Sequence, residues 1–231
     1  MAYTEYTLRK SFPDISVCRA VVPHTSHVVR QSTTSGIVVN SRSSVIAWLI
    51  EKCTSLNLLI DTYAIAVSLF DRSRNQVPHE SADDQWLAAV ALSISCKYME
   101  AKSPAVEHIF AFLVDKDQAP FLGTLDRIRV NIIEVLILRS VDYKVRCVST
   151  CCHENFSGQL HKLYRFVFYF AHFDPQLARS PRLGSSCAYI VRSVSGNDSD
   201  FDLLAIRIVH VINALYRNCP DLAKKCQAVL L

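Results

Sequence analysis

The apolar residues of this chain recur at steps of three and four from about residue 40 onward, which is the spacing of amphipathic helices. Residues 1–40 show no such period apart from a short helix expected over Ala2–Ser11, and we interpret them as an N-terminal arm. The pattern then predicts a bundle of five helices, at residues 43–56, 61–74, 85–99, from 103 onward, and at 124–141. These helices form one predicted domain over residues 41–148.

Two of the predicted helices have distinctive patterns. The third follows Ser81-Ala-Asp-Asp84, which has the form of a capping box, and it is apolar or small on nearly every side. A helix of this kind belongs in the centre of a bundle. The fifth shows an apolar stripe that we expect to face the core, which consists of Leu125, Ile128, Ile132, Val135 and Leu136.

A second run of helices follows a polar connector at residues 142–158. Apolar spacing predicts its helices at residues 160–171, 183–194, 203–216 and 220–231. The two halves share size and rhythm but little residue identity, so the repeat is one of architecture. The second domain is therefore expected over residues 149–231.

Composition favours an all-α fold with two cores. Half of the 231 residues are hydrophobic, whereas 5 glycines and 8 prolines are too few for the turns of a many-stranded β protein. The formal net charge of +4 includes no run of basic residues, so nothing favours direct binding to nucleic acid. The first residues are polar and no stretch reaches the roughly 18 apolar residues of a membrane span, so we expect a soluble chain without membrane contact.

The 9 cysteines form an odd set without the spacing of a disulfide framework, as expected of reduced thiols in the nucleus or the cytoplasm. Cys147, Cys151, Cys152 and His153 lie close together and raise the question of a zinc site. Adjacent cysteines do not have the paired spacing of structural zinc ligands, and no second pair lies at a suitable distance. We expect no metal and no cofactor.

Three segments of the first domain resemble the cyclin box: Asp71-Arg72, the helix from Leu87 to Glu100, and Glu134 with Tyr143. Arg42, Asp71 and Lys97 also stand at the spacing of the arginine, aspartate and lysine of that box. The second domain resembles the shorter carboxy-terminal cyclin repeat, mostly in architecture. The resemblance implies two tandem five-helix cyclin folds after the N-terminal arm.

The resemblance is to a divergent cyclin, such as the viral ones that include those of fish retroviruses. Ser41 stands where a methionine usually precedes the box arginine, Ser44 begins the apolar pair after it, and Trp86 replaces a leucine. These departures limit which properties of the family can be carried over.

The resemblance implies that Lys97 and Glu134 bind the regulatory helix of a cyclin-dependent protein kinase. Lysine donates to carbonyls and glutamate accepts from N–H groups, so the pair can recognise main chain without depending on kinase side chains. The apolar contacts implied around the pair are Ile94, Tyr98, Leu138 and Tyr143. Core packing is the alternative for Ile94 and Leu138, whereas the tyrosine hydroxyls prefer a hydrated edge.

Two further sets of residues are implied. Arg42 and Asp71 are expected to form a structural ion pair between the first two helices. A groove that docks substrate or inhibitor peptides would use Val45, Trp48, Glu51 and Gln85, and the serines at 41 and 44 predict weaker or altered docking.

The expected function is that of a cyclin, a regulatory subunit without catalytic residues that activates its kinase and controls cell-cycle progression. The sequence agrees in having no phosphate-binding glycine loop, no nucleophile elbow and no paired-histidine metal helix. Three alternatives remain: a transcriptional cyclin acting with a Mediator or elongation kinase on RNA polymerase II, a DNA-binding transcription factor with paired cyclin folds, and an adaptor that binds a kinase without activating it.

Overall fold

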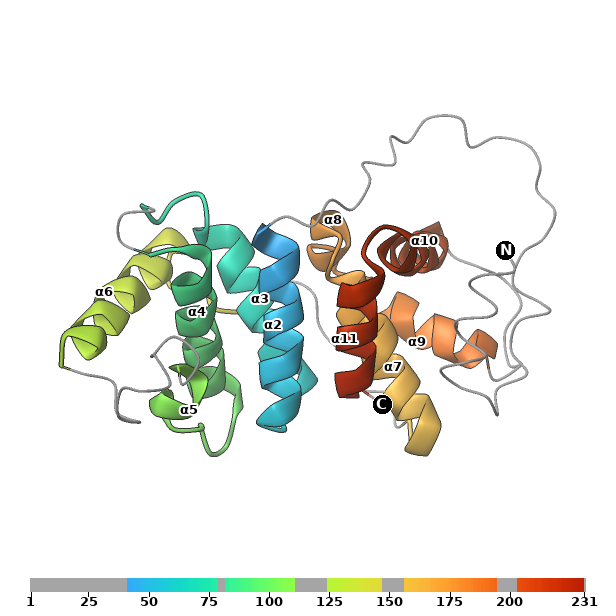
Figure 1. Cartoon of the computed structure of the whole chain (residues 1–231), viewed down its shortest axis with the longest axis horizontal. Coiled ribbons are helices and arrows are strands. Elements are labelled where there is room, and N and C mark those ends of the chain that lie inside the picture. The colour runs from blue at the N-terminus through green and yellow to red at the C-terminus, as the bar shows by residue number, and fades with distance from the viewer. Residues whose placement is uncertain (1–40, 79–81, 111–123, 147–155, 195–202, 231) are drawn as a thin grey trace. The chain divides into compact units, whose positions relative to one another are not determined.

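The computed structural model describes residues 41–78, 82–110, 124–146, 156–194 and 203–230. Every regular element among them is an α-helix, which confirms the predicted fold class (Figure 1). The helices belong to two compact units. We call α2–α6 with α8 the amino-terminal unit, and α7 with α9–α11 the carboxy-terminal unit.

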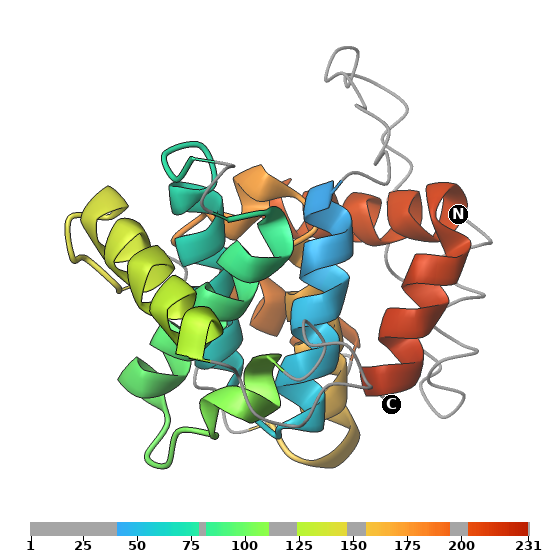
Figure 2. The same ribbon diagram turned by 60° about the vertical axis from the view of Figure 1, so that its left-hand side comes forward.

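The amino-terminal unit is arranged around α4. Its helices are α2 (Ser41–Ser55), α3 (Ile60–Ser73), α4 (Asp84–Met99), α5 (Val106–Phe110), α6 (Thr124–Ser140) and the short α8 (Pro175–Ala178). Helix α4 lies among the helices of the unit and packs on α2, α3, α5 and α6 (Figures 1 and 2). Every residue from Trp86 to Cys96 is buried. The prediction of a central helix is confirmed.

Carboxylates cap the starts of both α4 and α3. Asp83 accepts hydrogen bonds from the N–H groups of Gln85 and Trp86 at 3.0 and 2.9 Å, so α4 has a single-residue cap, whereas Ser81 of the expected capping box lies outside the described residues. Glu100, which follows α4, caps α3 from a distance. Its Oε1 accepts from the Leu59 N–H at 2.8 Å and from the Thr62 hydroxyl at 2.6 Å.

Helix α6 is apolar on two opposite sides. The side that packs on α4 and α3 carries Val130, Ile133 and Ile137, all buried. The stripe expected to face the core is largely exposed, with Ile128 at 50%, Ile132 at 53% and Val135 at 43%. The prediction for these three residues is wrong, because a helical period identifies an apolar side without showing which of two such sides meets the bundle.

Trp86 joins α4 to the helices on either side of it. Its buried ring lies 5.6 Å from the ring of Phe110 in α5, and the Arg129 guanidinium of α6 lies 4.4 Å from its centre. A guanidinium over an indole is a favourable cation–π pair. The tryptophan therefore links α4 to both α5 and α6, and the core accommodates it where the resemblance led us to expect a leucine.

The carboxy-terminal unit contains α7 (Gly158–Ala171), α9 (Leu183–Val194), α10 (Leu203–Asn218) and α11 (Pro220–Leu230). Its core contains stacked aromatic rings. The ring centre of Phe170 lies 4.3 Å from that of Phe166 and 6.0 Å from that of Tyr216. The Tyr216 hydroxyl donates to Gln227 Oε1 at 2.6 Å and so joins α10 to α11.

The boundary expected after residue 148 falls among residues 147–155, outside the described part. Residues 172–181, including α8, pack with the amino-terminal unit, although they were expected in the second domain. The tandem repeat stays a prediction. No helix in the described ranges is long and apolar enough to cross a membrane.

Replacing Trp86 by alanine should lower the free energy of unfolding by about 3–5 kcal/mol, because it leaves a cavity among three helices. Trp86→Phe, which keeps a ring between Phe110 and Arg129, should lose less than half as much. Urea denaturation followed by circular dichroism measures both. Equal losses for Trp86→Ala and for Leu59→Ala, whose side chain is exposed, would contradict this role.

Candidate functional site

Lys97 and Glu134 form an ion pair at the surface of the amino-terminal unit. Lys97, in the last turn of α4, donates from Nζ to Oε1 and Oε2 of Glu134 in α6 at 2.9 and 2.6 Å. Their side chains are 50% and 21% exposed. Exposed pairs of this kind contribute about 0–1 kcal/mol to stability. The fold therefore does not depend on the pair, and its remaining donor and acceptor capacity faces solvent.

Two tyrosines lie at the surface where the pair's helices end. Tyr98, next to Lys97, is 55% exposed, and Tyr143, just after α6, is 64% exposed. Leu138 is half-buried, and Ile94 is buried in the core of the unit. The tyrosines therefore present apolar rings at the surface, whereas Ile94 acts as a core residue that supports the site from below.

The backbone that presents Tyr143 is held in an uncommon conformation. Asp142 and Tyr143 have φ angles of 53° and 57°, a left-handed region that non-glycine residues seldom occupy. Several hydrogen bonds hold this turn. Among them, the Tyr143 N–H donates to Leu138 O at 2.8 Å, and Arg72 of α3 donates to the carbonyls of Lys144 and Val141 at 2.8 and 3.1 Å.

Arg72 is thus a positioning residue of the site that the sequence reasoning missed. Its only signal in the sequence was its place beside Asp71 in the matched motif. No pattern of spacing connects it with the turn after α6, because the contact spans 72 residues.

Arg42 joins three segments of the same unit. Its Nε and Nη2 donate to the two carboxylate oxygens of Asp71, both at 2.7 Å, and its Nη1 donates to the carbonyls of His172 and Phe173 at 3.0 and 3.1 Å. Both side chains of the pair are less than a tenth exposed. The structure brings the two residues together as a fork, and it adds the segment before α8, which no sequence argument connected to α2.

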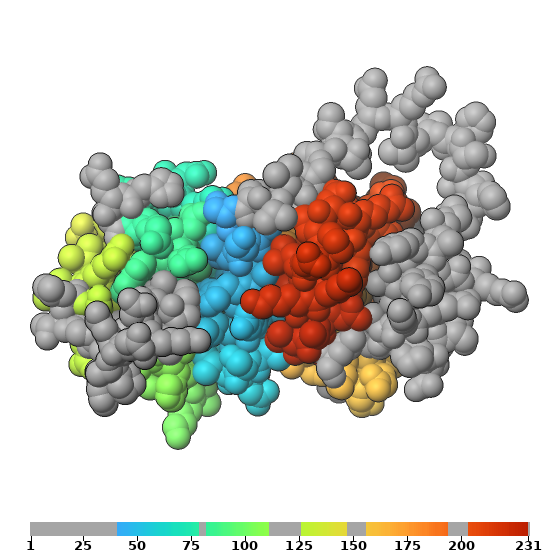
Figure 3. Space-filling view, in the orientation of Figure 1, coloured from blue at the N-terminus to red at the C-terminus, as the bar shows by residue number. Residues whose placement is uncertain are grey.

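The end of the expected docking groove nearest Gln85 is lined by polar and charged side chains. Arg74 of α3 binds both carboxylate oxygens of Asp84 at 3.0 and 2.8 Å and also donates to the Ser41 hydroxyl. A pocket of about 600 Å³ here is lined by Ser41, Arg74, Asp83, Asp84 and Gln85. It lies where the start of α2 (blue) comes to the surface beside the segment leading into α4 (green; Figure 3).

The other expected groove residues lie along α2, outside this pocket. Val45 is buried, whereas Trp48 and Glu51 are half-buried. Peptide docking here stays a prediction, and the structure places an ion pair, not an apolar surface, at the end of the groove nearest Gln85.

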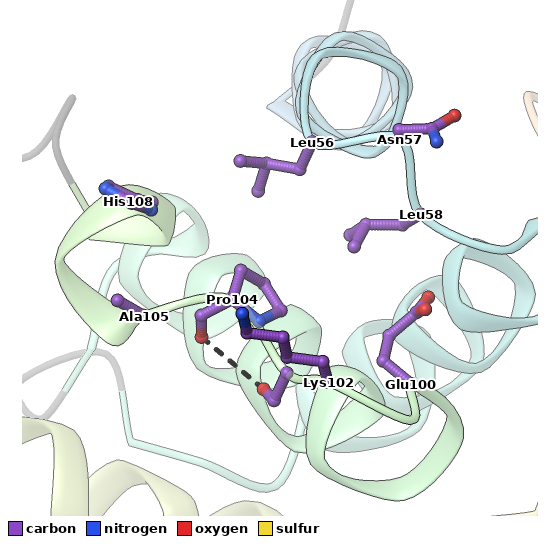
Figure 4. Close-up of a pocket in the computed structure, with 9 residues that line it drawn as sticks. Leu56, Asn57, Leu58, Glu100, Lys102, Pro104, Ala105 and His108 are labelled. Carbon is purple, nitrogen blue, oxygen red and sulfur yellow. Dashed lines mark hydrogen bonds between the residues drawn. The ribbon is translucent and has the colours of Figure 1, made fainter.

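A second pocket, of about 390 Å³, lies between the end of α2 and the segment from α4 to α5 (Figure 4). Its walls are Leu56, Asn57 and Leu58 on one side and residues between Glu100 and His108 on the other. The Glu100 carboxylate in this pocket already accepts hydrogen bonds from the start of α3. We therefore interpret the pocket as a result of the packing of two loops.

The structure gives no sign of metal or thiol chemistry in its described part. No group of three or more His, Cys, Asp or Glu side chains there could hold a metal ion. The cluster of Cys147, Cys151, Cys152 and His153 lies outside the described residues. Burial, with a smaller contribution from Glu100, raises the pKa of Cys96 to about 12, and burial also raises the pKa of Cys187, so both thiols stay protonated and unreactive.

The chain is similar in sequence to known proteins. Residues 17–146 match the family model described as "Cyclin, N-terminal domain". The chain is 25% identical over 177 residues to S-phase entry cyclin-6 of Saccharomyces cerevisiae, a match that covers 70% of this chain and 43% of that protein. The matched region thus spans less than half of the relative's length.

Two solved structures share the fold. A chain of the yeast RNA Pol II CTD kinase CTDK-1 complex has a TM-score of 0.57 at 18% identity, with 78% of this chain and 66% of that chain covered. A viral cyclin from Herpesvirus saimiri has a TM-score of 0.51 at 14% identity, with 82% and 83% covered. At these identities the likeness concerns the fold alone.

Replacing Arg42 by alanine should lower the free energy of unfolding by about 3–5 kcal/mol, because it leaves the Asp71 carboxylate buried without its partner. Arg42→Ala/Asp71→Ala should lose less than the sum of the two single variants, since the stranded charge is then absent. Urea denaturation of the full chain measures this coupling. A control, Lys144→Ala, removes an exposed ion pair and should leave the midpoint unchanged; strictly additive losses would show that the Arg42–Asp71 pair is not coupled.

Proposed function

Since the chain belongs to the cyclin family, we propose that it binds and activates a cyclin-dependent protein kinase through the surface around Lys97 and Glu134, and so regulates cell-cycle progression. Members of this family are regulatory subunits of kinases and not enzymes themselves. The observation that carries the proposal is the exposed ion pair between α4 and α6, with Tyr98 and Tyr143 at the surface beside it.

The pair suits a partner that presents free backbone N–H and carbonyl groups. Glu134 has oxygens that can accept N–H groups while they still bind Lys97, and the ammonium group can donate to carbonyls. Hydrogen bonds to charged groups contribute about 1.5–3 kcal/mol when the charge is desolvated. The tyrosines exclude water from the pair when a partner covers them, which strengthens these bonds.

Activation follows from binding one state of the kinase better than the other. Phosphate transfer requires the strand lysine of a kinase to pair with a glutamate on its regulatory helix. A subunit that contacts this helix only in its inward position shifts the equilibrium toward the active state, by as much as its affinities for the two states differ. The cyclin supplies no catalytic group in this mechanism. Its site of action is the nucleus or the cytoplasm, where such kinases work.

The proposal is tested by binding and activity measurements with a panel of purified cyclin-dependent kinases, both cell-cycle and transcriptional. Lys97→Ala/Glu134→Ala should weaken kinase binding by about 100-fold, the equivalent of two lost charge-assisted bonds. It should also abolish activation at a concentration that saturates wild type. Calorimetry and phosphorylation of a peptide substrate provide the two readouts.

The control for this experiment is Arg74→Ala/Asp84→Ala, which removes an ion pair at the opposite end of α4. It should leave kinase affinity within about twofold of wild type. Unchanged binding by Lys97→Ala/Glu134→Ala would refute the site, and wild-type binding without activation would identify an adaptor. Activation restricted to the transcriptional kinases of the panel would assign the chain to transcription.

A further inference from the structure

The sequence contains two serines that proline follows directly, in Ser103-Pro104 and in Ser180-Pro181. Proline has no backbone N–H group. An active site that offers no hydrogen-bond acceptor after the target serine therefore accepts proline there, whereas any other residue would leave its N–H unpaired. Proline-directed protein kinases select their serines in this way, so both dipeptides have the sequence of a phosphorylation site.

Ser103 lies in a segment that such an enzyme can reach. Residues 100–105, which connect α4 to α5, are not helical, and Ser103 is exposed within them. Its hydroxyl lies 3.5 Å from Pro104 O, which is longer than an ordinary O–H···O hydrogen bond. Enzymes that modify a folded chain reach it most readily at exposed segments outside helices. The Ser103 hydroxyl is therefore available for reaction.

Ser180 has the same neighbour but a different environment. It is half-buried in the short connection 179–182 between α8 and α9, and its N–H donates to Leu177 O at 2.9 Å. A kinase that binds this segment in an extended form must first break that hydrogen bond and open the turn between two helices. Ser180 is thus much less available, and it serves as an internal control for Ser103.

The pocket of about 390 Å³ that Ser103 lines has room for a phosphate group (Figure 4). Lys102 and His108 line it as well, and both are exposed. Asn57, in the opposite wall, adds an amide with two N–H donors. A phosphoserine carries a charge of about −1.5 to −2 and three strong acceptor oxygens. The donors around the pocket match these oxygens.

One carboxylate, that of Glu100, is found among the described residues that line the pocket. It already accepts hydrogen bonds from the Leu59 N–H and the Thr62 hydroxyl, which reduce its effect on a neighbouring anion. The ammonium group of Lys102 offsets the remaining charge. A phosphate on Ser103 is therefore attracted into the pocket and not repelled from it.

We propose that Ser103 is a phosphorylation site of a proline-directed protein kinase, and that its phosphate binds in this pocket to Lys102 and His108. ATP supplies the phosphoryl group: the bond between its γ-phosphorus and the bridging oxygen breaks, a bond to Ser103 Oγ forms, and ADP and the hydroxyl proton leave. The phosphate then links the segment between α4 and α5 to the end of α2. This site is independent of the proposed function, because any kinase with this preference can use it.

The site is tested by incubating the full chain with ATP and, separately, with two purified proline-directed kinases. These are a mitogen-activated protein kinase and a cyclin-dependent kinase already bound to its own cyclin. Mass spectrometry of the peptides should find phosphate on Ser103 at about tenfold or more the occupancy of Ser180. Ser103→Ala should remove this phosphate, and Pro104→Ala, which keeps the serine, should lower it by a similar factor.

Circular dichroism establishes that both variants remain folded. No phosphate on Ser103 with either kinase, or equal occupancy of Ser103 and Ser180, would overturn the assignment. Full phosphorylation of Pro104→Ala would do the same, because the proline would then play no part in selecting the serine.

Thermal unfolding tests where the phosphate binds. Phosphorylation of Ser103 should raise the midpoint of the wild type by about 2–4 °C, through new charge-assisted hydrogen bonds across the pocket. Lys102→Ala/His108→Ala should show no rise. The matched control, His210→Ala/Lys224→Ala, removes an exposed histidine and an exposed lysine from the carboxy-terminal unit and should keep the rise. An unchanged wild-type midpoint, or an equal rise in the pocket variant, would refute binding of the phosphate in the pocket.

Discussion

The amino-terminal unit depends on one guanidinium. Arg42 enters the core from the first turn of α2 and is satisfied by a carboxylate from α3 and by two carbonyls from the segment before α8. A charge at this depth is tolerated only when all its partners are present. The three segments must therefore meet in one arrangement, and α3 in turn positions α4, on which the candidate site is built.

The residues of the candidate site contribute little to the stability of the fold. Its ion pair is exposed, its tyrosines are exposed, and the residues that fix them lie underneath or behind: Ile94 in the core and Arg72 on α3. A surface of this construction can change its partner preference without loss of the fold, because recognition and stability depend on different side chains. This agrees with a chain whose relatives share its architecture at low identity.

Much of the fold could be predicted from the sequence because helix α4 is apolar on all sides, which only a central position explains. The starts and ends of α2, α3 and α6 fell within two residues of the predicted ones, since apolar spacing decides them. The period could not show which side of α6 is buried, because the adjacent and equally apolar Ile132 and Ile133 differ only in the structure, where one is exposed and the other buried. The role of Arg72 and the two carbonyls that accept from Arg42 could not be predicted. Both involve long-range hydrogen bonds to backbone, which leave no pattern of residue types in the sequence.

The left-handed turn at Asp142 and Tyr143 has a consequence for the speed and strength of association. Because Arg72 and Leu138 hold this turn in the free protein, its residues give up their conformational entropy during folding and not during binding. A partner then meets Tyr143 already in place, and the free energy of contact is not reduced by ordering a loop. Such a surface binds as a rigid body, so differences in affinity among partners should reside in their dissociation rates.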